Sequence, residues 1–330
     1  MGHPRRRYEH GGVYFITNRL AEGLPFVPNE YINRLILGVL SLAQEKCSDI
    51  AICALIFLQN HYHMVLVPQG DPARVKDFMN IFNGELAKMV CKLLGKRHVK
   101  IWAQRYHAAQ ILNAEACIKQ LAYLYANPCS ARVVNSIESW PGVSSWKALS
   151  EGKDIEIIDS YKYIRSRYIS KLPNKPFSQL EIEQLCKMLD DLPGRSRSIV
   201  FKPFAWKSAF IETKLLSNQT LKETLVTGLH TLEKERIKAG SPKFKLSDSK
   251  LLSLQNPYKF YKPKEFGLRV ICISTCLELR KSFIQLYKDF CEKCSVAWEQ
   301  WRLGNYSFTY PSGAYLPTSF PRSSIYNIDY

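Results

Sequence analysis

The stretch IAICALIFLQNHYHMVLV, residues 50–67, predicts the centre of the fold. Residues 50–58 are a continuous apolar run typical of a buried strand, residues 59–60 form a short turn, and residues 61–67 return as the antiparallel partner. Side chains alternate between the two faces of a strand, so His61 and His63 project from the same face. Two imidazoles placed in this way can bind one metal ion.

A second motif, Tyr-Leu-Tyr-Ala-Asn-Pro at residues 123–128, begins 60 residues after His63. If this stretch is helical, Tyr123 and Asn127 lie one turn apart on the same helix face. Tyr123 then supplies a nucleophile and Asn127 a third metal ligand. Tyr125 is a second candidate nucleophile, but its spacing does not align it with Asn127.

The order of the elements predicts the fold class. Apolar spacing indicates strand, helix, strand, strand, helix, strand and helix, over residues 13–18, 29–44, 50–58, 61–67, 72–94, 105–112 and from 114 onward. Asn113 is expected to cap the last of these helices. This order predicts an α+β protein with a ferredoxin-like antiparallel sheet and one added, tyrosine-bearing helix.

These motifs resemble the HUH single-tyrosine transposases, and most closely the REP-associated branch. The resemblance covers about the first 147 residues and also rests on four further motifs, GHPRR at 2–6, GVYFIT at 12–17, RYH at 105–107 and WPGVSSW at 140–146. It implies that the added helix packs across the sheet and brings Tyr123 and Asn127 over the two histidines. It also implies cleavage and transfer of single-stranded DNA next to a hairpin, through a 5′-phosphotyrosine intermediate.

The chain departs from the family pattern at two places. The residue between the histidines is Tyr62, where the family usually has a plain aliphatic side chain, and its ring is expected to face away from the metal into the core. After Asn127 and Pro128, the family continues with a small residue or glycine into an apolar end, whereas this chain reads CSARVV at 129–134. The end of the tyrosine helix is therefore expected to differ.

The residue types also indicate the cofactor. Two imidazoles and one amide oxygen leave coordination positions open for a phosphate oxygen and water. This set suits Mn²⁺ at least as well as Mg²⁺, which prefers ligand shells made of oxygen alone. The expected cofactor is therefore a divalent ion, Mg²⁺ or Mn²⁺.

Charge points to a polyanionic partner. The net charge is +17, and residues 1–150 hold 17 Lys and Arg against 10 Asp and Glu (+7), which leaves 29 against 19 (+10) for residues 151–330. Basic side chains that could contact phosphates occur at residues 5–7 and 97–105, and Trp102 and Tyr106 could stack on an unpaired base. The candidate DNA-binding residues are His3, Arg5, Arg6, Arg7, Arg97, Lys100, Trp102, Arg105 and Tyr106.

Composition along the chain suggests two domains. We expect an HUH nuclease domain over residues 1–150, a linker over 151–176 that ends in a proline-containing segment, and a basic, mainly helical domain over 177–330. Helices are predicted to begin after Ser178, within a capping box with Glu181, and to cover residues 218–236 and 268–301. Residues 304–330 are expected to form an extended arm docked on the body.

No run of 18 apolar residues and no signal peptide is recognisable, so a cytoplasmic protein without a membrane partner is expected. The ten cysteines fit reduced thiols. Four of them (Cys272, Cys276, Cys291 and Cys294) have spacings that allow zinc, but an amphipathic helical pattern around them favours small core residues. The chain is expected to act as a monomer or a homodimer.

Two other functions compete with a transposase acting on single-stranded DNA. A replication initiator or relaxase would share the chemistry, although such nickases usually carry a helicase or larger architecture, and no glycine-rich phosphate loop is present here. A non-catalytic regulator that binds hairpin DNA is the alternative from another class. The intact histidine pair and tyrosine favour catalysis, because a chain released from catalysis need not keep them.

Overall fold

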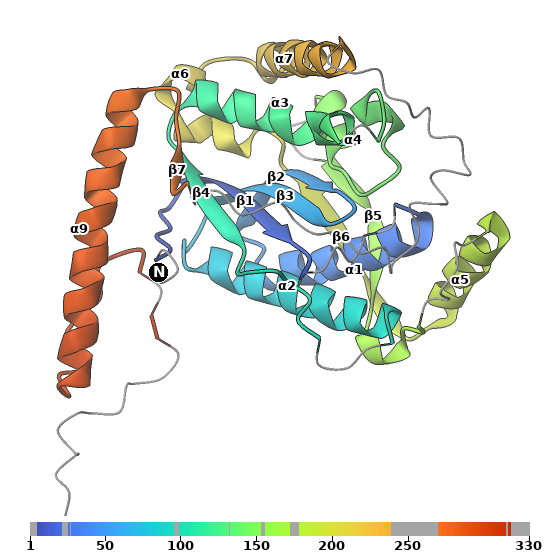
Figure 1. Cartoon of the computed structure of the whole chain (residues 1–330), viewed down its shortest axis with the longest axis horizontal. Coiled ribbons are helices and arrows are strands. Elements are labelled where there is room, and N and C mark those ends of the chain that lie inside the picture. The colour runs from blue at the N-terminus through green and yellow to red at the C-terminus, as the bar shows by residue number, and fades with distance from the viewer. Residues whose placement is uncertain are drawn as a thin grey trace, which may run out of the picture.

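A mixed seven-stranded sheet with helices on both faces forms the body of the protein (Figure 1). The computed structural model describes residues 5–21, 26, 28–95, 99–131, 133–152, 156–171, 178–238, 270–314 and 316–317, with only the backbone at 156–160. The strand order is β5-β6-β2-β3-β1-β4-β7. The strands are β1 (Val13–Arg19), β2 (Ile50–Phe57), β3 (His61–Pro68), β4 (His107–Ile111), β5 (Glu156–Ile164), β6 (Gly194–Phe201) and β7 (Cys272–Ile273).

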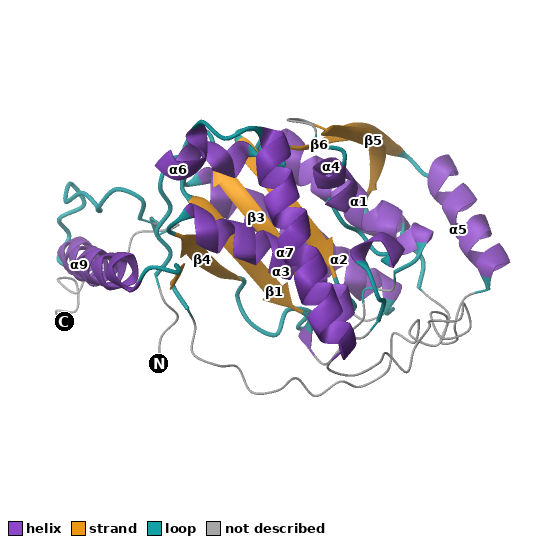
Figure 2. Cartoon of the chain, turned by 90° about the horizontal axis from the view of Figure 1, so that it is seen from above, coloured by secondary structure: helices purple, strands orange, loops and turns teal. Residues whose placement is uncertain are grey.

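The helices lie in two layers, with α1 and α2 below the sheet in Figure 1 and α3 and α7 above it. In the view from above, α9 lies at one end of the molecule and α5 at the other (Figure 2). The helices are α1 (Glu30–Lys46), α2 (Arg74–Leu93), α3 (Ala114–Ser130), α4 (Trp146–Ser150), α5 (Gln179–Asp191), α6 (Ile211–Lys214), α7 (Asn218–Lys238) and α9 (Leu277–Arg302). Short 3₁₀ turns cover Ile137–Ser139, Ser166–Tyr168 and Ala205–Ala209.

The first 130 residues follow the predicted order of elements. The β2–β3 hairpin is antiparallel, with Phe57 opposite Tyr62, and β1 lies antiparallel between β3 and β4. Asn29 caps α1 by accepting a hydrogen bond from the Ile32 N–H at 2.9 Å. The four central strands and their helices were thus predictable from hydrophobic periodicity.

The later elements differ from the sequence expectation. Residues 151–176, expected as a linker, contain β5, which pairs with β6, and β6 in turn pairs parallel with β2 at Ile52 and Phe201. The last helix begins at Leu277, nine residues after its predicted start, because Cys272 and Ile273 form β7 beside β4. Helices still predominate in the rest of the C-terminal region, and the division into two domains remains a prediction.

Asn113 has a different role from the predicted cap. It occupies the N-cap position of α3, but its side chain makes no capping hydrogen bond. Its Oδ1 instead accepts hydrogen bonds from the Thr275 N–H at 3.2 Å and the Ser274 hydroxyl at 3.0 Å. The side chain therefore attaches the segment between β7 and α9 to the start of α3.

Each face of the sheet has its own hydrophobic core. One face packs on α1 and α2 and includes Tyr62, whose hydroxyl donates to Asn83 Oδ1 at 2.8 Å, so this ring points away from the histidine face as expected. The other face packs on α3 and α7 through residues such as Phe15, Val65 and Leu124. In the described part of the chain, no helix combines the length and apolar character needed to span a membrane.

The outer edge of β2 is shared by two segments. Its first half lies next to β6, whereas its second half is bonded to the WPGVSSW segment, where Phe57 N–H donates to Val143 O and Ser145 N–H donates to Leu55 O, both at 2.9 Å. The Trp140 indole also donates to Phe57 O at 3.1 Å. These bonds satisfy backbone groups that an open edge would leave unpaired.

A close helix–strand approach gives a stability prediction. A Cβ atom added at Gly38, in the middle of α1, would lie 2.5 Å from the Lys162 carbonyl oxygen of β5, whereas one added at Gly84 in α2 would meet no atom within 4 Å. Gly38→Ala should therefore lower the free energy of unfolding by about 1–3 kcal/mol. Gly84→Ala, the matched control, should raise it by about 0.5–1 kcal/mol through helix propensity. Urea unfolding measures both, and equal effects of the two substitutions would contradict the packing of α1 on β5.

Candidate metal and tyrosine site

The two histidines of β3 lie together on the face of the sheet that α3 covers. Their ring centroids are 4.9 Å apart, and His63 stacks on Phe15 with centroids 5.2 Å apart. Asn60 Oδ1 lies 2.6 Å from His61 Nδ1. When Asn60 accepts this hydrogen bond, the proton of His61 is on Nδ1 and the Nε2 lone pair is left for a metal.

His63 is a buried imidazole without a hydrogen bond. Only 7% of the residue is exposed, and neither Nδ1 nor Nε2 has a hydrogen-bond partner among the described residues. A buried polar group without a partner costs free energy, so natural structures rarely leave one without a reason. A bound metal ion would satisfy one of these nitrogens.

Burial keeps both imidazoles in the form that binds metals. Burial lowers the pKa of His61 to about 4, and the charge of Arg19 acts in the same direction. Burial, followed by the neighbouring His61 and Arg19, lowers the pKa of His63 well below its usual value. Both rings are therefore neutral at pH 7, and the neutral imidazole is the ligand form.

Tyr123 reaches the same place from α3. Its ring centroid is 6.0 Å from that of His63, and 40% of the residue is exposed. The phenol therefore lies beside the unpartnered imidazole and is still accessible to a large substrate. The proximity of the α3 tyrosine to the histidine strand, which depends on packing, could not be predicted from sequence spacing.

Asn127 lies one helical turn after Tyr123 and is buried. Its Nδ2 donates to the carbonyl oxygens of Tyr123 at 2.9 Å and Leu124 at 3.3 Å. The Leu124 carbonyl lacks its usual helical donor because the residue four positions later is Pro128. Because Nδ2 makes these two hydrogen bonds, Oδ1 is the amide atom left without a hydrogen-bond donor among the described residues. An amide oxygen is the atom of this side chain that coordinates a metal ion.

Tyr125 is placed differently from Tyr123. It is fully buried, its ring packs against Trp146, and its hydroxyl lies 2.8 Å from Ser145 Oγ. Ser145 Oγ also accepts from the Leu55 N–H at 2.8 Å and contacts the Leu55 carbonyl at 3.3 Å. Burial raises the pKa of Tyr125, so this phenol is both inaccessible and difficult to ionise.

Sequence reasoning gave no role to Thr17 and His107, which share a row with His63. Thr17 of β1 is opposite His63 of β3 on one side and opposite His107 of β4 on the other. Residues directly opposite each other project from the same face, so all three side chains lie on the α3 face. Neighbouring strands lie about 4.8 Å apart, so the row extends about 10 Å from His63 to His107. Only the strand register reveals this row.

The predicted DNA-binding arginines gather near the start of β4. Arg5 and Arg105 are exposed, whereas the Arg6 guanidinium lies 3.4 Å from the centroid of the Tyr106 ring and Arg7 forms an ion pair with Glu9. Lys100 is exposed on the preceding segment. His3 and Arg97 lie outside the described residues. Contact of these residues with DNA remains a prediction.

The two aromatic candidates are already packed within the protein. Tyr106 is 7% exposed, and its hydroxyl lies 3.1 Å from that of Tyr8. Trp102 donates from its indole N–H to the Asn83 carbonyl at 3.0 Å, and its ring lies 5.9 Å from that of Tyr62. In this arrangement the rings serve the core, so stacking on a base would require them to be uncovered.

The donor set is small for a metal centre. The described residues contain no cluster of three or more His, Cys, Asp or Glu side chains that could hold a metal ion. A site at the histidine pair therefore depends on the amide oxygen of Asn127 and on ligands from substrate and water.

Distant similarity to known proteins is found among solved structures. No protein-family model matches the chain, and no curated protein matches it. Among solved structures, a REP-associated tyrosine transposase bound to a REP hairpin is similar, with a TM-score of 0.37 and 21% identity, over 46% of this chain and 86% of that chain. The functional proposal therefore rests on the residues described above.

The contrast between the two tyrosines predicts different effects on stability. Tyr125→Phe removes a buried hydrogen bond to Ser145 and should lower the free energy of unfolding by about 1 kcal/mol. Tyr123→Phe removes a hydroxyl from a half-exposed ring and should change this free energy by less than about 0.5 kcal/mol. Chemical denaturation measures the free energy of unfolding of both variants. A larger decrease in Tyr123→Phe than in Tyr125→Phe would contradict the orientation of α3.

Proposed function

We propose that this protein is a metal-dependent single-stranded DNA endonuclease and strand transferase of the HUH single-tyrosine type. Tyr123 is the nucleophile, and His61, His63 and Asn127 hold a divalent ion. One observation carries the proposal: the buried imidazole of His63, whose nitrogens have no hydrogen-bond partner among the described residues, lies beside the accessible ring of Tyr123, with ring centroids 6.0 Å apart. The row of His63, Thr17 and His107 extends this site across three strands.

The chemistry of these side chains suits a divalent ion. Two neutral imidazoles and one amide oxygen are ligands that Mn²⁺ accepts readily and that Mg²⁺ accepts with supplementary waters. When bound, the ion supplies charge neutralisation on the non-bridging phosphate oxygens. Asn60 supports this function by orienting the His61 ring, and the helix carbonyls of Tyr123 and Leu124 orient the Asn127 amide.

The phenol of Tyr123 performs the covalent step. Its Oη attacks the phosphorus atom of a DNA phosphodiester, and the bond from phosphorus to the 3′-oxygen breaks. The phenol proton passes to water as the new bond forms, and the leaving 3′-oxygen takes a proton from water. The products are a 5′-phosphotyrosine and a free 3′-hydroxyl. Attack by a 3′-hydroxyl on this phosphotyrosine rejoins DNA without ATP, because the phosphoester bond energy is retained.

The sheet topology is compatible with this function. The order β4-β1-β3-β2, with α1 and α2 together on one face, supports assignment of residues 13–111 to a ferredoxin-like unit. We propose that α3 is the added helix that carries the nucleophile to the open face. The proposed substrate is single-stranded DNA beside a hairpin, and the basic charge of both halves of the chain is consistent with a DNA partner.

The first test is trapping of a covalent adduct. Incubation with labelled single-stranded DNA from the flanks of its gene and Mn²⁺ should give a protein–DNA adduct that mass mapping places on Tyr123. Tyr123→Phe should abolish it, while Tyr125→Phe should retain it, because Tyr125 is buried. An adduct on Tyr125 would refute the nucleophile assignment, and tight hairpin binding without any adduct would favour the regulatory alternative.

Metal binding gives a second test that does not depend on catalysis. Calorimetry should detect one Mn²⁺ site in the free protein, and His63→Ala should weaken it by at least about tenfold, since one of only three protein ligands is removed. His230→Ala is the matched control, because this half-exposed histidine pairs with Glu233 on α7. Unchanged Mn²⁺ affinity in His63→Ala would exclude the proposed ligand set.

A further inference from the structure

A hollow lined by lysine side chains lies near the start of β2, where β3 and β6 both end. Its volume is about 520 Å³, which is within the range of sites that bind small molecules. Phe204 and Ala205 form its apolar part. The other side chains of this lysine hollow are basic or polar and come from separate segments of the chain: Gln69, Lys202, Lys207, Ser208, Lys214 and Asn218.

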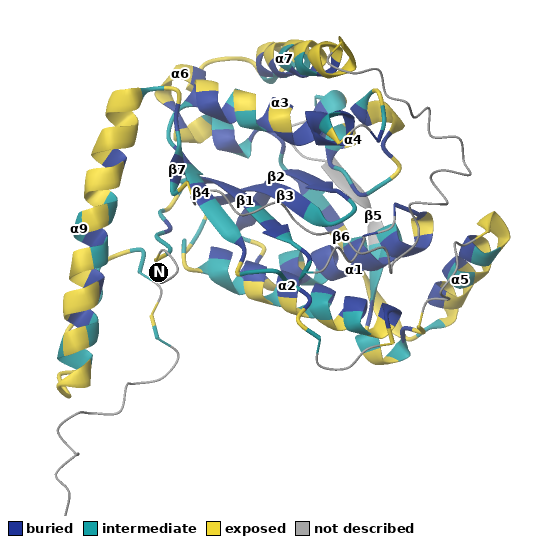
Figure 3. Ribbon diagram, viewed as in Figure 1, coloured by how far each residue is buried: buried dark blue, intermediate teal, exposed yellow. Residues whose placement is uncertain are grey.

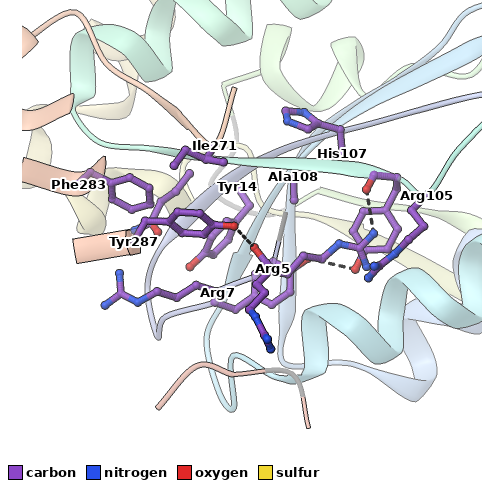
Figure 4. A pocket seen from close by; sticks show the side chains of 13 residues that line it. Arg5, Arg7, Tyr14, Arg105, His107, Ala108, Ile271, Phe283 and Tyr287 are labelled. Carbon is purple, nitrogen blue, oxygen red and sulfur yellow. Dashed lines mark hydrogen bonds between the residues drawn. The ribbon is translucent and has the colours of Figure 1, made fainter. Parts of the chain in front are cut away.

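The arginines near the N-terminus leave much less room. The Tyr287 hydroxyl donates to the Arg5 carbonyl oxygen at 2.6 Å, and Arg7 is paired with Glu9 (Figure 4). The hollow that remains among these groups measures about 40 Å³, which is room for about one water molecule. Of these two basic hollows, the lysine hollow is the one that can admit a ligand larger than water.

The three lysines of the hollow have no acidic partner in the part of the chain that the structure describes. Lys202, Lys207 and Lys214 form no ion pair there, and no described Asp or Glu lines the hollow. Asp49, the residue before β2, is paired with Arg74 at 3.5 Å. Like charges gathered without a counter-ion repel one another, so an anion bound in the hollow would relieve this repulsion.

Two of the lysines are held in place by neutral groups. Lys202 and Lys207 are half-buried. The Lys202 Nζ donates to Gln69 Oε1 at 2.6 Å, and the Lys207 Nζ reaches Asn218 Oδ1 at the longer distance of 3.5 Å. An amide oxygen positions an ammonium group without neutralising it, and the ammonium group has three N–H donors. Lysines that are ordered in this way lose less side-chain entropy when they bind a ligand.

The start of α7 adds positive potential at the rim of the hollow. Asn218 is the first residue of this 21-residue helix, and the first turn of the helix contains no acidic residue. The N-terminal end of a helix carries a partial positive charge that attracts anions. Most of α6 and the outer side of α7 are exposed, so the rim is open to a ligand from solution (Figure 3).

The lysine hollow is separate from the tyrosine site. Gln69 comes six residues after His63, directly past the end of β3. A strand rises about 3.3 Å per residue, so these two residues are about 20 Å apart. A single nucleotide bound at one of the two places does not contact the other.

We propose that the lysine hollow is a binding site for a phosphate group, carried either by a free nucleotide or by a nucleic-acid backbone. Lys202, Lys207 and Lys214 supply the charge, and the start of α7 supplies a further positive end. Lysine is a common phosphate ligand because its ammonium group acts as a compact point charge. The inference does not depend on the proposed function, since none of these residues belongs to the metal and tyrosine site.

The first arm of the test uses adenosine diphosphate as the probe and the full chain in EDTA, so that no metal ion is bound at the histidine pair. Calorimetry should detect one site for adenosine diphosphate, whereas adenosine, which has no phosphate, should not bind. Lys202→Ala and Lys207→Ala should each weaken binding by about tenfold, because each removes a charged hydrogen bond to the phosphate.

The second arm uses an unpaired oligonucleotide and protein that carries Tyr123→Phe, so that no adduct forms. If the phosphate belongs to a nucleic acid, each lysine substitution lowers the slope of log K against log salt by about 0.7. A lower slope without binding of adenosine diphosphate assigns the hollow to a nucleic-acid backbone. Binding of adenosine diphosphate with an unchanged slope assigns it to a free nucleotide, and either result supports the phosphate site.

The matched control is Lys187→Ala, which removes the same charge from an exposed position on α5, far from α6 in Figure 2. This variant should bind both probes as the unsubstituted chain does. The proposal is overturned if Lys202→Ala and Lys207→Ala leave the binding of both probes unchanged. It is also overturned if Lys187→Ala weakens binding as much as they do, because the effect would then come from net charge alone.

Discussion

The burial of Tyr125, whose ring packs against Trp146 and whose hydroxyl meets Ser145, fixes the rotation of α3, and the candidate site depends on that rotation. Two residues correspond to about 200° around an α-helix, so burying Tyr125 on one flank turns Tyr123 toward the other. Ser145 is suited to this role because its hydroxyl bonds both the phenol and the backbone of β2.

The sheet provides the second half of the site and connects it to the rest of the chain. Its register places Thr17 between His63 and His107, so three adjacent strands contribute to one row. Strands from the C-terminal region extend both edges, with β5 and β6 beyond β2 and β7 beyond β4. These additions hold both β2, which supports α3, and β4, which leads to the exposed arginines. The C-terminal region is therefore part of the platform on which the proposed chemistry takes place.

Local sequence patterns predicted the central elements well because those elements follow simple periodicities. Alternation along the strand placed His61 and His63 on one face of the sheet, and helical spacing placed Tyr123 and Asn127 on one face of a helix. Neither prediction needed knowledge of packing. β7 was missed because it is two residues long, and the apolar residues before Leu277 also fit a helix. Asn113 was expected to cap α3, but distant partners at Ser274 and Thr275 compete for its side chain.

The positions of the aromatic candidates were beyond sequence reasoning for a similar reason. Trp102 and Tyr106 were considered for base stacking because exposed rings near basic residues often bind nucleic acid. Their burial is decided by Asn83 and Tyr8, which lie 19 and 98 residues away in the chain. Composition gives the number of aromatic rings, but it does not show which of them the folded chain buries.

The most direct test of the proposed metal site is the position of manganese in a crystal of this protein, determined from the anomalous scattering of the metal. We predict one strong peak within about 2.2 Å of a ring nitrogen of both His61 and His63, on the side that faces Tyr123 and Asn127. A manganese peak elsewhere, or a His63 ring hydrogen-bonded to protein groups with no metal beside it, would contradict the proposed site.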